Sequence, residues 1–244
     1  KEAKGRLFSH LKKCRTKYCD DKKIIHKATT GLRKTDLNRI KKTTVMNLDD
    51  EYASYFSDFW AEEKIGFHNP ITNYTPHNTK ESNLKVIGFG DIKAGQTGTS
   101  FTVFTSALGG GGIGINLHLL GEFNVANAMT AVCVASTQGV SWAEIKKGLE
   151  GVEGVAGRLE RIDEGQPFTV IVDYAFEPNA VEKLYDTICV LPHNRIIHVL
   201  GSAGGGRDVA RRPILGKLAG KNADIVIVTN EDPYDDDPQI IIDQ

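Results

Sequence analysis

The sequence has little cysteine, methionine or tryptophan, with four, two and two residues among 244. Four cysteines without a repeating spacing do not make a disulfide framework and are typical of a reducing compartment. No apolar run approaches the roughly 20 residues that are needed to cross a bilayer. The amino terminus has no apolar core of a signal peptide. We therefore expect a cytoplasmic protein that does not enter the membrane.

A phosphate-binding P-loop is also absent. Gly95–Thr99 and Gly109–Gly112 are rich in glycine, but neither is followed by the Lys that such a loop requires, and the second leads into an expected strand. The chain also starts inside an expected helix and stops without a terminating signal. We therefore expect a fragment of a longer protein.

Charge is balanced overall but not along the chain. Residues 1–44 contain 15 Lys and Arg against 4 acidic residues, which leaves 15 basic and 27 acidic residues for the rest of the 30 and 31. Nucleic-acid binding by this basic segment is disfavoured because it has almost no aromatic residues for base stacking. His10, Cys14, Cys19 and His26 form an alternative zinc site, but the cysteine spacing is loose and the neighbouring lysines repel a cation. A charged surface insertion over 14–42 is the favoured interpretation.

The hydrophobic pattern predicts an α/β protein. In the first part, apolar runs predict strands at 43–48, 65–67, 84–88, 100–105 and 113–119. Helices are expected at 1–13 (with Leu7, Phe8 and Leu11 on one face), 49–60 and 125–137. Ser141 and Glu144 have the spacing of a capping box, which predicts another helix that ends before Gly151.

The second part centres on two apolar segments around a Gly165-Gln166-Pro167 turn. Gly157–Arg161 is expected as a short strand, and Phe168–Asp173 as a buried parallel strand that ends on an aspartate. Helices at 179–190 and 213–219 then alternate with strands at 195–200 and 224–229. This β-α-β order predicts a parallel sheet, and ligands bind at the carboxyl ends of such strands.

Several motifs occur in one order along the chain: Glu2-Ala3-Lys4-x-x-Leu7-Phe8, Asn47-Leu48-Asp49-Asp50, Gly121-x-Phe123-Asn124-x-x-Asn127-Ala128, Gly157-Arg158-Leu159-Glu160, Val172-Asp173-Tyr174-Ala175, Gly204-Gly205-x-Arg207-Asp208 with Arg212-Pro213, and Asp232-Pro233. In this order the chain resembles the Mur ligase family. Within that family it is most similar to the enzymes that add the third residue to a UDP-N-acetylmuramoyl dipeptide. The resemblance runs from residue 1 to 244 and is weakest over 14–42.

The resemblance implies a domain order and a reaction. Residues 1–156 would be the end of the central ATP-binding domain, and residues 157–244 would begin a Rossmann-like C-terminal domain. Missing ahead of Lys1 would be the UDP-binding domain and the P-loop. The implied activity is ATP-dependent amide-bond formation, through an acyl phosphate, between a UDP-N-acetylmuramoyl-peptide and a free amino acid. ATP and Mg²⁺ would take part, a monomer is expected, and this piece alone would be inactive.

The resemblance also assigns roles to residues. Lys4 would be carbamylated and so become an anion that holds Mg²⁺; otherwise it is a helix-surface lysine. Asn124 and Asn127 would contact the nucleotide, although Asn124 also suits an N-cap. Arg158, Asp173 and Tyr174 would bind the nucleotide, Asp173 through the ribose hydroxyls. Alternatively, Arg158 forms an interdomain ion pair and Asp173 caps the helix that follows Pro178. Substrate contacts would come from a last set: Arg207 and Asp208 (which would otherwise pair with each other), Glu231, Asp232, Pro233 and Tyr234.

Two departures from the family pattern bear on function. Phe176 stands where the family usually has His, which removes a titratable nitrogen. Tyr234 stands where diaminopimelate-adding enzymes carry an Arg, and Asp235–Asp237 follow it; these acids suit a cationic end such as that of lysine, or they begin a helix. Two other functions remain open: a ligase of the folylpolyglutamate or cyanophycin synthetase kind, and a non-catalytic binding protein of the same fold.

Overall fold

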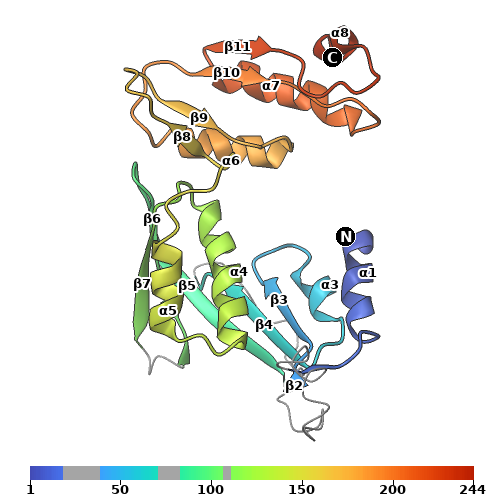
Figure 1. The fold of residues 1–244 in the computed structure, drawn as a ribbon, viewed down its shortest axis with the longest axis vertical. Coiled ribbons are helices and arrows are strands. Elements are labelled where there is room, and N and C mark those ends of the chain that lie inside the picture. The colour runs from blue at the N-terminus through green and yellow to red at the C-terminus, as the bar shows by residue number, and fades with distance from the viewer. Residues whose placement is uncertain (19–38, 71–82, 107–110) are drawn as a thin grey trace, which may run out of the picture. The chain divides into compact units, whose positions relative to one another are not determined.

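The computed structural model describes residues 1–18, 39–70, 83–106 and 111–244 (Figure 1). The chain divides into two compact units that interleave in sequence. The first comprises Lys1–Asp91, Phe101–Ile115 and Ala126–Lys147, and the second comprises Ile92–Ser100, Asn116–Val125 and Gly148–Gln244. The domain boundary at residue 157 stays a prediction.

The largest sheet contains five strands in the order β3-β4-β5-β6-β7. The strands are β3 (Thr43–Asn47), β4 (Glu63–His68), β5 (Leu84–Ala94), β6 (Thr99–Phe104) and β7 (Gly112–Leu117). The first three run parallel, with Val45 opposite Ile65 and Ile65 opposite Lys85. Its fully buried side chains Phe101, Val103 and Ile115 form the core of the first unit with Met129 and Val132 of α4 (Phe123–Thr137). All five strands were predicted, with shorter limits for β4 and β5.

Aromatic packing joins α1 (Glu2–Leu11) to α3 (Ala53–Ser57). The ring centroid of Phe8 lies 4.8 Å from that of Phe56 and 5.8 Å from that of Phe59. The prediction that Leu7 shares this face was wrong, because its side chain is 73% exposed. The helix expected over 49–60 is shortened to α3, since Asp50 Oδ1 accepts the Tyr52 N–H in a turn before it.

The capping box is confirmed at the start of α5 (Trp142–Glu150). Glu144 Oε2 accepts the Ser141 hydroxyl at 2.6 Å, and Ser141 Oγ accepts the Glu144 N–H at 3.3 Å. The hydrogen bonds from Ser141 lower the pKa of the Glu144 carboxyl. Two reciprocal bonds of this kind fix where a helix begins.

The basic segment contributes a two-strand antiparallel ladder. It pairs β1 (Lys17–Tyr18) with β2 (Arg39–Ile40), and Arg39 forms an ion pair with Glu62. Of the four residues considered for zinc, Cys19 and His26 lie outside the described residues. Within the described ranges, no group of three His, Cys, Asp or Glu side chains is placed to hold a metal ion. None of the helices in that part of the chain is long and apolar enough to span a bilayer.

The strand that ends on Asp173 differs from the prediction. β9 (Val170–Val172) pairs antiparallel with β8 (Glu160–Ile162), and Val172 is 45% exposed rather than buried. The connection over 163–169 is a hairpin loop in which Gln166 Nε2 donates to the Ile162 carbonyl at 2.7 Å. A parallel pair needs a crossover of about a dozen residues or more, which this loop cannot supply.

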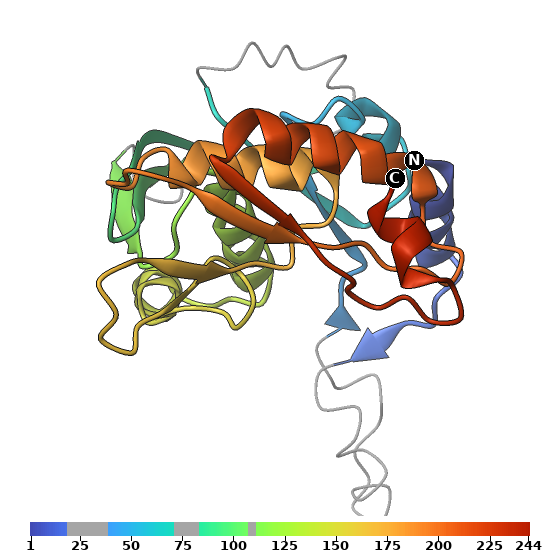
Figure 2. The same ribbon diagram turned by 90° about the horizontal axis from the view of Figure 1, so that it is seen from above.

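The predicted β-α-β arrangement is present further along the chain. β10 (Ile197–Leu200) and β11 (Ile225–Val228) run parallel, and η4 (Val209–Arg211) and α7 (Arg212–Asn222) connect them. α7 packs against α6 (Pro178–Ile188), as Figure 2 shows from above. Val181, Tyr185 and Leu215 form the buried core beneath the strands. A last short helix, α8 (Pro238–Ile242), has Asp237 as its N-cap.

The two faces of the β10–β11 pair differ. On the inner face, the Tyr185 hydroxyl shares a 2.6 Å hydrogen bond with His198 Nδ1. Burial raises the pKa of Tyr185 and lowers the pKa of His198, so both groups stay neutral near pH 7. On the outer face, Ile197, Val199, Ile225 and Ile227 are 40–60% exposed.

Candidate active site

The motif that begins at Gly157 forms a turn, not the start of a strand. Gly157 and Leu159 both have positive φ, +66° and +48°. A non-glycine residue in this region is uncommon and is held there only by its surroundings. Here Leu159 is buried, and Glu160 Oε2 accepts the Gly157 N–H at 2.7 Å. The turn is therefore a fixed feature rather than a loose linker.

Asp173 holds this turn against the end of β9. Its Oδ2 accepts the Leu159 N–H and its Oδ1 accepts the Ala175 N–H, both at 2.7 Å. The Tyr174 N–H in turn donates to the Gly157 carbonyl at 2.9 Å. The alternative that Asp173 caps the next helix was wrong, because Glu177 is the N-cap of α6. A carboxylate has about four lone-pair positions, so two remain for ligand hydroxyls.

Arg158 lies over an aromatic ring. Its guanidinium carbon is 5.5 Å from the ring centroid of Tyr174, whose side chain is 61% exposed. Such a contact holds the cation at the surface without neutralising it. Arg158 is thus free to meet an anionic group, whereas the interdomain ion pair suggested as its alternative stays a prediction.

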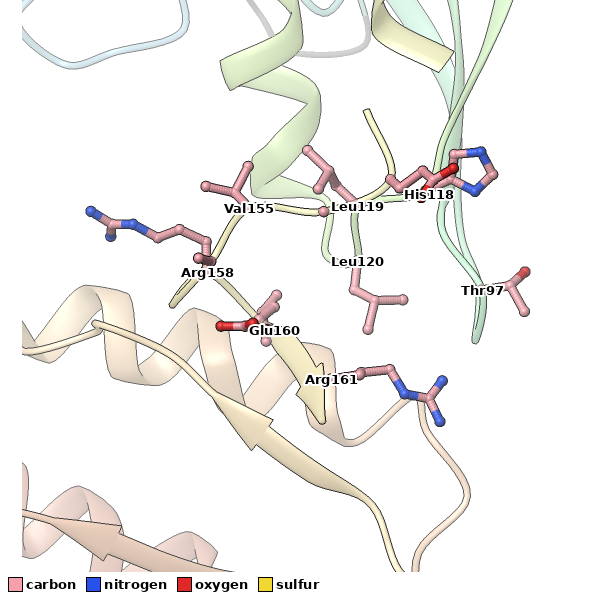
Figure 3. A pocket seen from close by; sticks show the side chains of 12 residues that line it. Thr97, His118, Leu119, Leu120, Val155, Arg158, Glu160 and Arg161 are labelled. Atoms are coloured by element: carbon pink, nitrogen blue, oxygen red, sulfur yellow. The ribbon is translucent and has the colours of Figure 1, made fainter. Parts of the chain in front are cut away.

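A cleft of about 410 Å³ opens beside the turn within the second unit. Its lining comes from three segments: Thr97, His118–Leu120 and Glu153–Arg161, apart from Gly157. Figure 3 shows the side chains of Arg158 and Arg161 extending in opposite directions from Glu160. The lining combines two arginines and two glutamates, Glu153 and Glu160, with apolar residues such as Leu119, Leu120 and Val155. A pocket with apolar walls and a few charged groups suits a ligand that carries both polar and apolar parts.

A close backbone approach brings Thr97 to the cleft. A Cβ on Gly98 would lie 2.0 Å from the Leu117 carbonyl oxygen. Only glycine therefore allows the backbone of the turn after β5 to pack against the backbone at the end of β7. Gly95 N–H and the Gly98 carbonyl close that turn at 2.9 Å. Thr97 and His118 were not found from the sequence, because neither belongs to a recognisable local motif.

Asn124 supports the cleft from α4. It lies inside the first turn of the helix, and its side-chain amide donates to the carbonyl of the cleft residue Leu120 at 2.8 Å. The alternative that Asn124 is the N-cap was wrong, since α4 begins at Phe123. Asn127 lies one turn further along α4 and is exposed.

The two loops after β10 and β11 are packed on each other. The Gly204 N–H donates to the Asp232 carbonyl at 2.9 Å, and the Gly205 N–H donates to Asp236 Oδ2 at 3.0 Å. A Cβ on Gly204 would lie 2.2 Å from the Pro233 carbonyl oxygen, so a larger residue would force the loops apart. Tyr234, with φ of +52°, places its ring against Gly205.

The remaining predicted substrate residues lie in the same loops. Arg207 and Glu231 are exposed. Asp208 Oδ1 accepts the Ala210 N–H at 3.0 Å and so caps η4; the suggested ion pair with Arg207 is not formed in the described structure. Asp237 caps α8, which confirms the alternative that the aspartate run begins a helix. These loop residues do not belong to the cleft lining, so the second unit contains two separate groups of predicted site residues.

Lys4 is exposed on α1 in the first unit. The helix is fixed by Gly5, where a Cβ would lie 2.2 Å from the Tyr55 hydroxyl oxygen. An exposed amine on a fixed helix is accessible to carbon dioxide. The role of Lys4 in holding a metal stays a prediction.

Comparison with known proteins gives the family. The model for the Mur ligase middle domain matches residues 35–135, and the model for the Mur ligase glutamate ligase domain matches residues 157–244. The chain belongs to the Mur ligase family.

Two Mur ligase relatives show how far the likeness extends. A UDP-N-acetylmuramyl-tripeptide synthetase from Roseiflexus sp. (strain RS-1) is 46% identical over 204 residues, which are 83% of this chain and 37% of that protein. A UDP-N-acetylmuramoyl-L-alanyl-D-glutamate--2,6-diaminopimelate ligase from Syntrophomonas wolfei is 39% identical over 199 residues, 81% of this chain and 37% of the relative. The chain thus spans a little over a third of these relatives.

Among solved structures, a UDP-N-acetylmuramate-alanine ligase from Thermotoga maritima matches with a TM-score of 0.56 and 22% identity. The match covers 83% of this chain and 40% of the other. At this identity the likeness supports the Mur ligase fold alone. Mixed α/β architecture with a parallel β-α-β element is therefore confirmed.

Proposed function

We propose that this chain is the nucleotide-binding and amino-acid-binding part of a ligase that uses ATP to add an amino acid to a UDP-N-acetylmuramoyl-peptide. The substrate carboxylate attacks the terminal phosphorus of ATP and becomes an acyl phosphate, and ADP leaves with the electron pair of the broken P–O bond. The neutral amine of the incoming amino acid attacks the acyl carbon, the new C–N bond forms, the nitrogen releases a proton to solvent, and inorganic phosphate leaves with the electron pair of the C–O bond. Positioning and charge neutralisation supply most of such catalysis.

The observation that carries this proposal is the Gly157–Glu160 turn, held by Asp173 at a polar cleft in a chain with two Mur ligase domains. Arg158 offers an exposed cation for phosphates, and Asp173 has lone pairs left for ribose hydroxyls. Asn124 and Asn127 contact the adenine base of the nucleotide. The Arg158 guanidinium lies over the Tyr174 ring. These residue types suit a nucleotide.

Lys4 supplies the metal side of the proposal. Its neutral amine adds to carbon dioxide, forms an N–C bond and releases a proton, and the product is a carbamate anion. Oxygen ligands of this kind are those that Mg²⁺ prefers. Bound Mg²⁺ would neutralise phosphate charge. In the loops after β10 and β11, Arg207, Asp208, Glu231, Asp232, Pro233 and Tyr234 receive the amino acid.

The reaction can be tested with a longer protein that carries this chain together with a P-loop. Given ATP, a UDP-N-acetylmuramoyl dipeptide and an amino acid, it should release ADP in step with formation of the tripeptide product. The 244-residue chain alone should release no ADP, because it has no loop to cradle the phosphates. ADP release by the short chain, or no product from the longer protein, would contradict the proposal.

The acceptor amino acid is expected to be lysine, or another residue without a distal carboxylate, rather than diaminopimelate. Tyr234 cannot clamp a carboxylate as an Arg does, and a half-buried carboxylate without a partner is costly. Asp236 and Asp237 accept backbone N–H groups, and Asp235 is exposed. These acids attract an ammonium group. Competition of the two amino acids for the UDP-linked dipeptide measures the preference, and a higher specificity constant for diaminopimelate would refute it.

A further inference from the structure

Arg211 is a buried cation with few partners. It ends η4 and is the N-cap of α7, and it is only 7% exposed. Its Nη1 lies 3.6 Å from Glu177 Oε1, which is an ion-pair distance but too long for a hydrogen bond. Its buried Nε has no hydrogen-bond partner. The guanidinium has five N–H donors, so most of its capacity is unused.

Phe176 packs against this guanidinium. The ring centroid of Phe176 lies 4.8 Å from the guanidinium carbon of Arg211, and the Tyr174 ring meets Phe176 edge-on at 5.4 Å. A ring face attracts a cation and fixes its plane, but it accepts no N–H hydrogen bond of ordinary strength. The contact therefore holds Arg211 in place and leaves its N–H groups available. A His at position 176 would add a titratable group beside the permanently charged guanidinium, and Phe cannot.

Two helices begin at the same place. Glu177 and Arg211 are the N-caps of α6 and α7, each helix is 11 residues long, and neither N-cap side chain bonds the helix N–H groups. Helix N-termini carry a partial positive charge. Pro178 and Pro213 have no N–H, and the Arg212 N–H donates to the Val209 carbonyl, so at these two positions the contribution is the helix dipole rather than free donors. Arg212 adds a second buried guanidinium, whose Nη groups donate to Gln244 Oε1 and the Ala203 carbonyl. Positive charge thus exceeds the charge of Glu177, whose side chain is 58% exposed.

We propose that Arg211 is the centre of an oxyanion-binding site at the starts of α6 and α7, which takes a carboxylate or phosphate group in place of Glu177. An oxyanion can accept two N–H groups of a guanidinium at once, which an ion pair at 3.6 Å does not achieve. Phe176 positions the guanidinium, and the exposed carboxylate of Glu177 screens the charge until the ligand arrives.

The sequence did not indicate this site. Arg207 and Arg212 belong to the motif Gly204-Gly205-x-Arg207-Asp208 with Arg212-Pro213, whereas Arg211 does not. It also stands apart from the ligase proposal, because it can be measured without ATP or a peptide substrate. Two sources of the anion are possible: the carboxylate of an amino acid and a phosphate group. They are distinguished by titrating each ion separately.

The experiment uses the 244-residue chain. Acetate and inorganic phosphate are titrated at constant ionic strength, with chloride as the reference, while the NMR signal of the Arg211 Nε–H group is followed. We expect a saturable shift with one of the two ions, acetate for a carboxylate site and phosphate for a phosphate site. Glu177→Gln should strengthen binding of that ion about two- to fivefold, because the Glu177 carboxylate no longer competes for Arg211. This factor corresponds to the free energy that an exposed ion pair contributes.

Variants separate this site from general charge effects. Arg211→Leu should weaken binding of the preferred ion at least about tenfold, read from the thermal midpoint as the ion is added. Arg195→Leu removes the same charge at an exposed position before β10 and should change nothing. Arg211→Lys keeps the charge without the fork and should bind weakly, which covers the case in which the Leu variant does not fold. No saturable shift with either ion, or equal binding by wild type and Arg211→Leu, would overturn the proposal.

Discussion

Lys4→Ala is expected to lower the turnover of a longer, P-loop-containing form of this protein by about 100-fold or more. Without the amine no carbamate forms, and a metal ligand is lost. Supplying formate or acetate should restore part of the activity, because a free carboxylate can occupy the space of the missing side chain. The rate of ADP release with substrate present is the measurement.

The structure indicates that Lys4→Ala should remove the amine without disturbing the packing of α1. Lys4 is exposed, whereas the packing of α1 depends on Gly5 against Tyr55 and on Phe8 against Phe56 and Phe59, so its loss should leave the helix in place. Lys13→Ala removes another exposed lysine just after the same helix and should keep full turnover. Normal turnover in Lys4→Ala, or rescue of Lys13→Ala by carboxylates, would end the carbamate hypothesis.

Asp173→Ala should have the largest effect on stability among the predicted site residues. It removes both acceptors that bind the Leu159 and Ala175 N–H groups. Hydrogen bonds to a charged group contribute about 1.5–3 kcal/mol each; because Asp173 is only partly buried, we expect a total loss of about 2–4 kcal/mol. Leu159 has positive φ and would leave that conformation, which opens the turn.

Urea unfolding of the 244-residue chain measures the loss, and binding of ADP to the longer form measures the opened turn. Asp173→Asn keeps one acceptor and should fall between wild type and Asp173→Ala. Asp186→Ala is the control: Asp186 is 73% exposed and pairs with Lys183 at 3.8 Å, an ion pair of little worth. If Asp173→Ala is as stable as Asp186→Ala, Asp173 does not hold the turn.

Local signals in the sequence predicted most of the fold. The capping box of Ser141 and Glu144 fixed the start of α5, and long apolar periodic runs located α4, α6 and the strands β10 and β11. These signals work because each depends on residues within a turn or two of one another. The prediction for Leu7 was wrong because a local pattern does not report tertiary contacts. The apolar residues of α1 do not show how wide its contact with α3 is.

Tertiary contacts were harder to predict. The apolar run before Asp173 gave no information about its partner. The Gly165-Gln166-Pro167 turn was identified, but the short loop around it was not used to infer that the strands on either side pair antiparallel. Motifs located Arg158, Asp173 and Asn124, but not what they bind. Asp173 was assigned to a ligand or a helix cap, and the structure adds two backbone N–H groups of the turn. Thr97, His118 and Arg211 come to their places only through folding, and no spacing in the sequence marks them.

The outer face of β10 and β11 affects how this chain behaves at high concentration. Ile197, Val199, Ile225 and Ile227 form a flat aliphatic patch without a charge, and the described pair has no neighbouring strand on either edge. Flat apolar strands with open edges are templates for association between copies, and natural sheets normally guard them with Lys, Pro or a bulge. We therefore expect any association between copies of the 244-residue chain to begin at this patch.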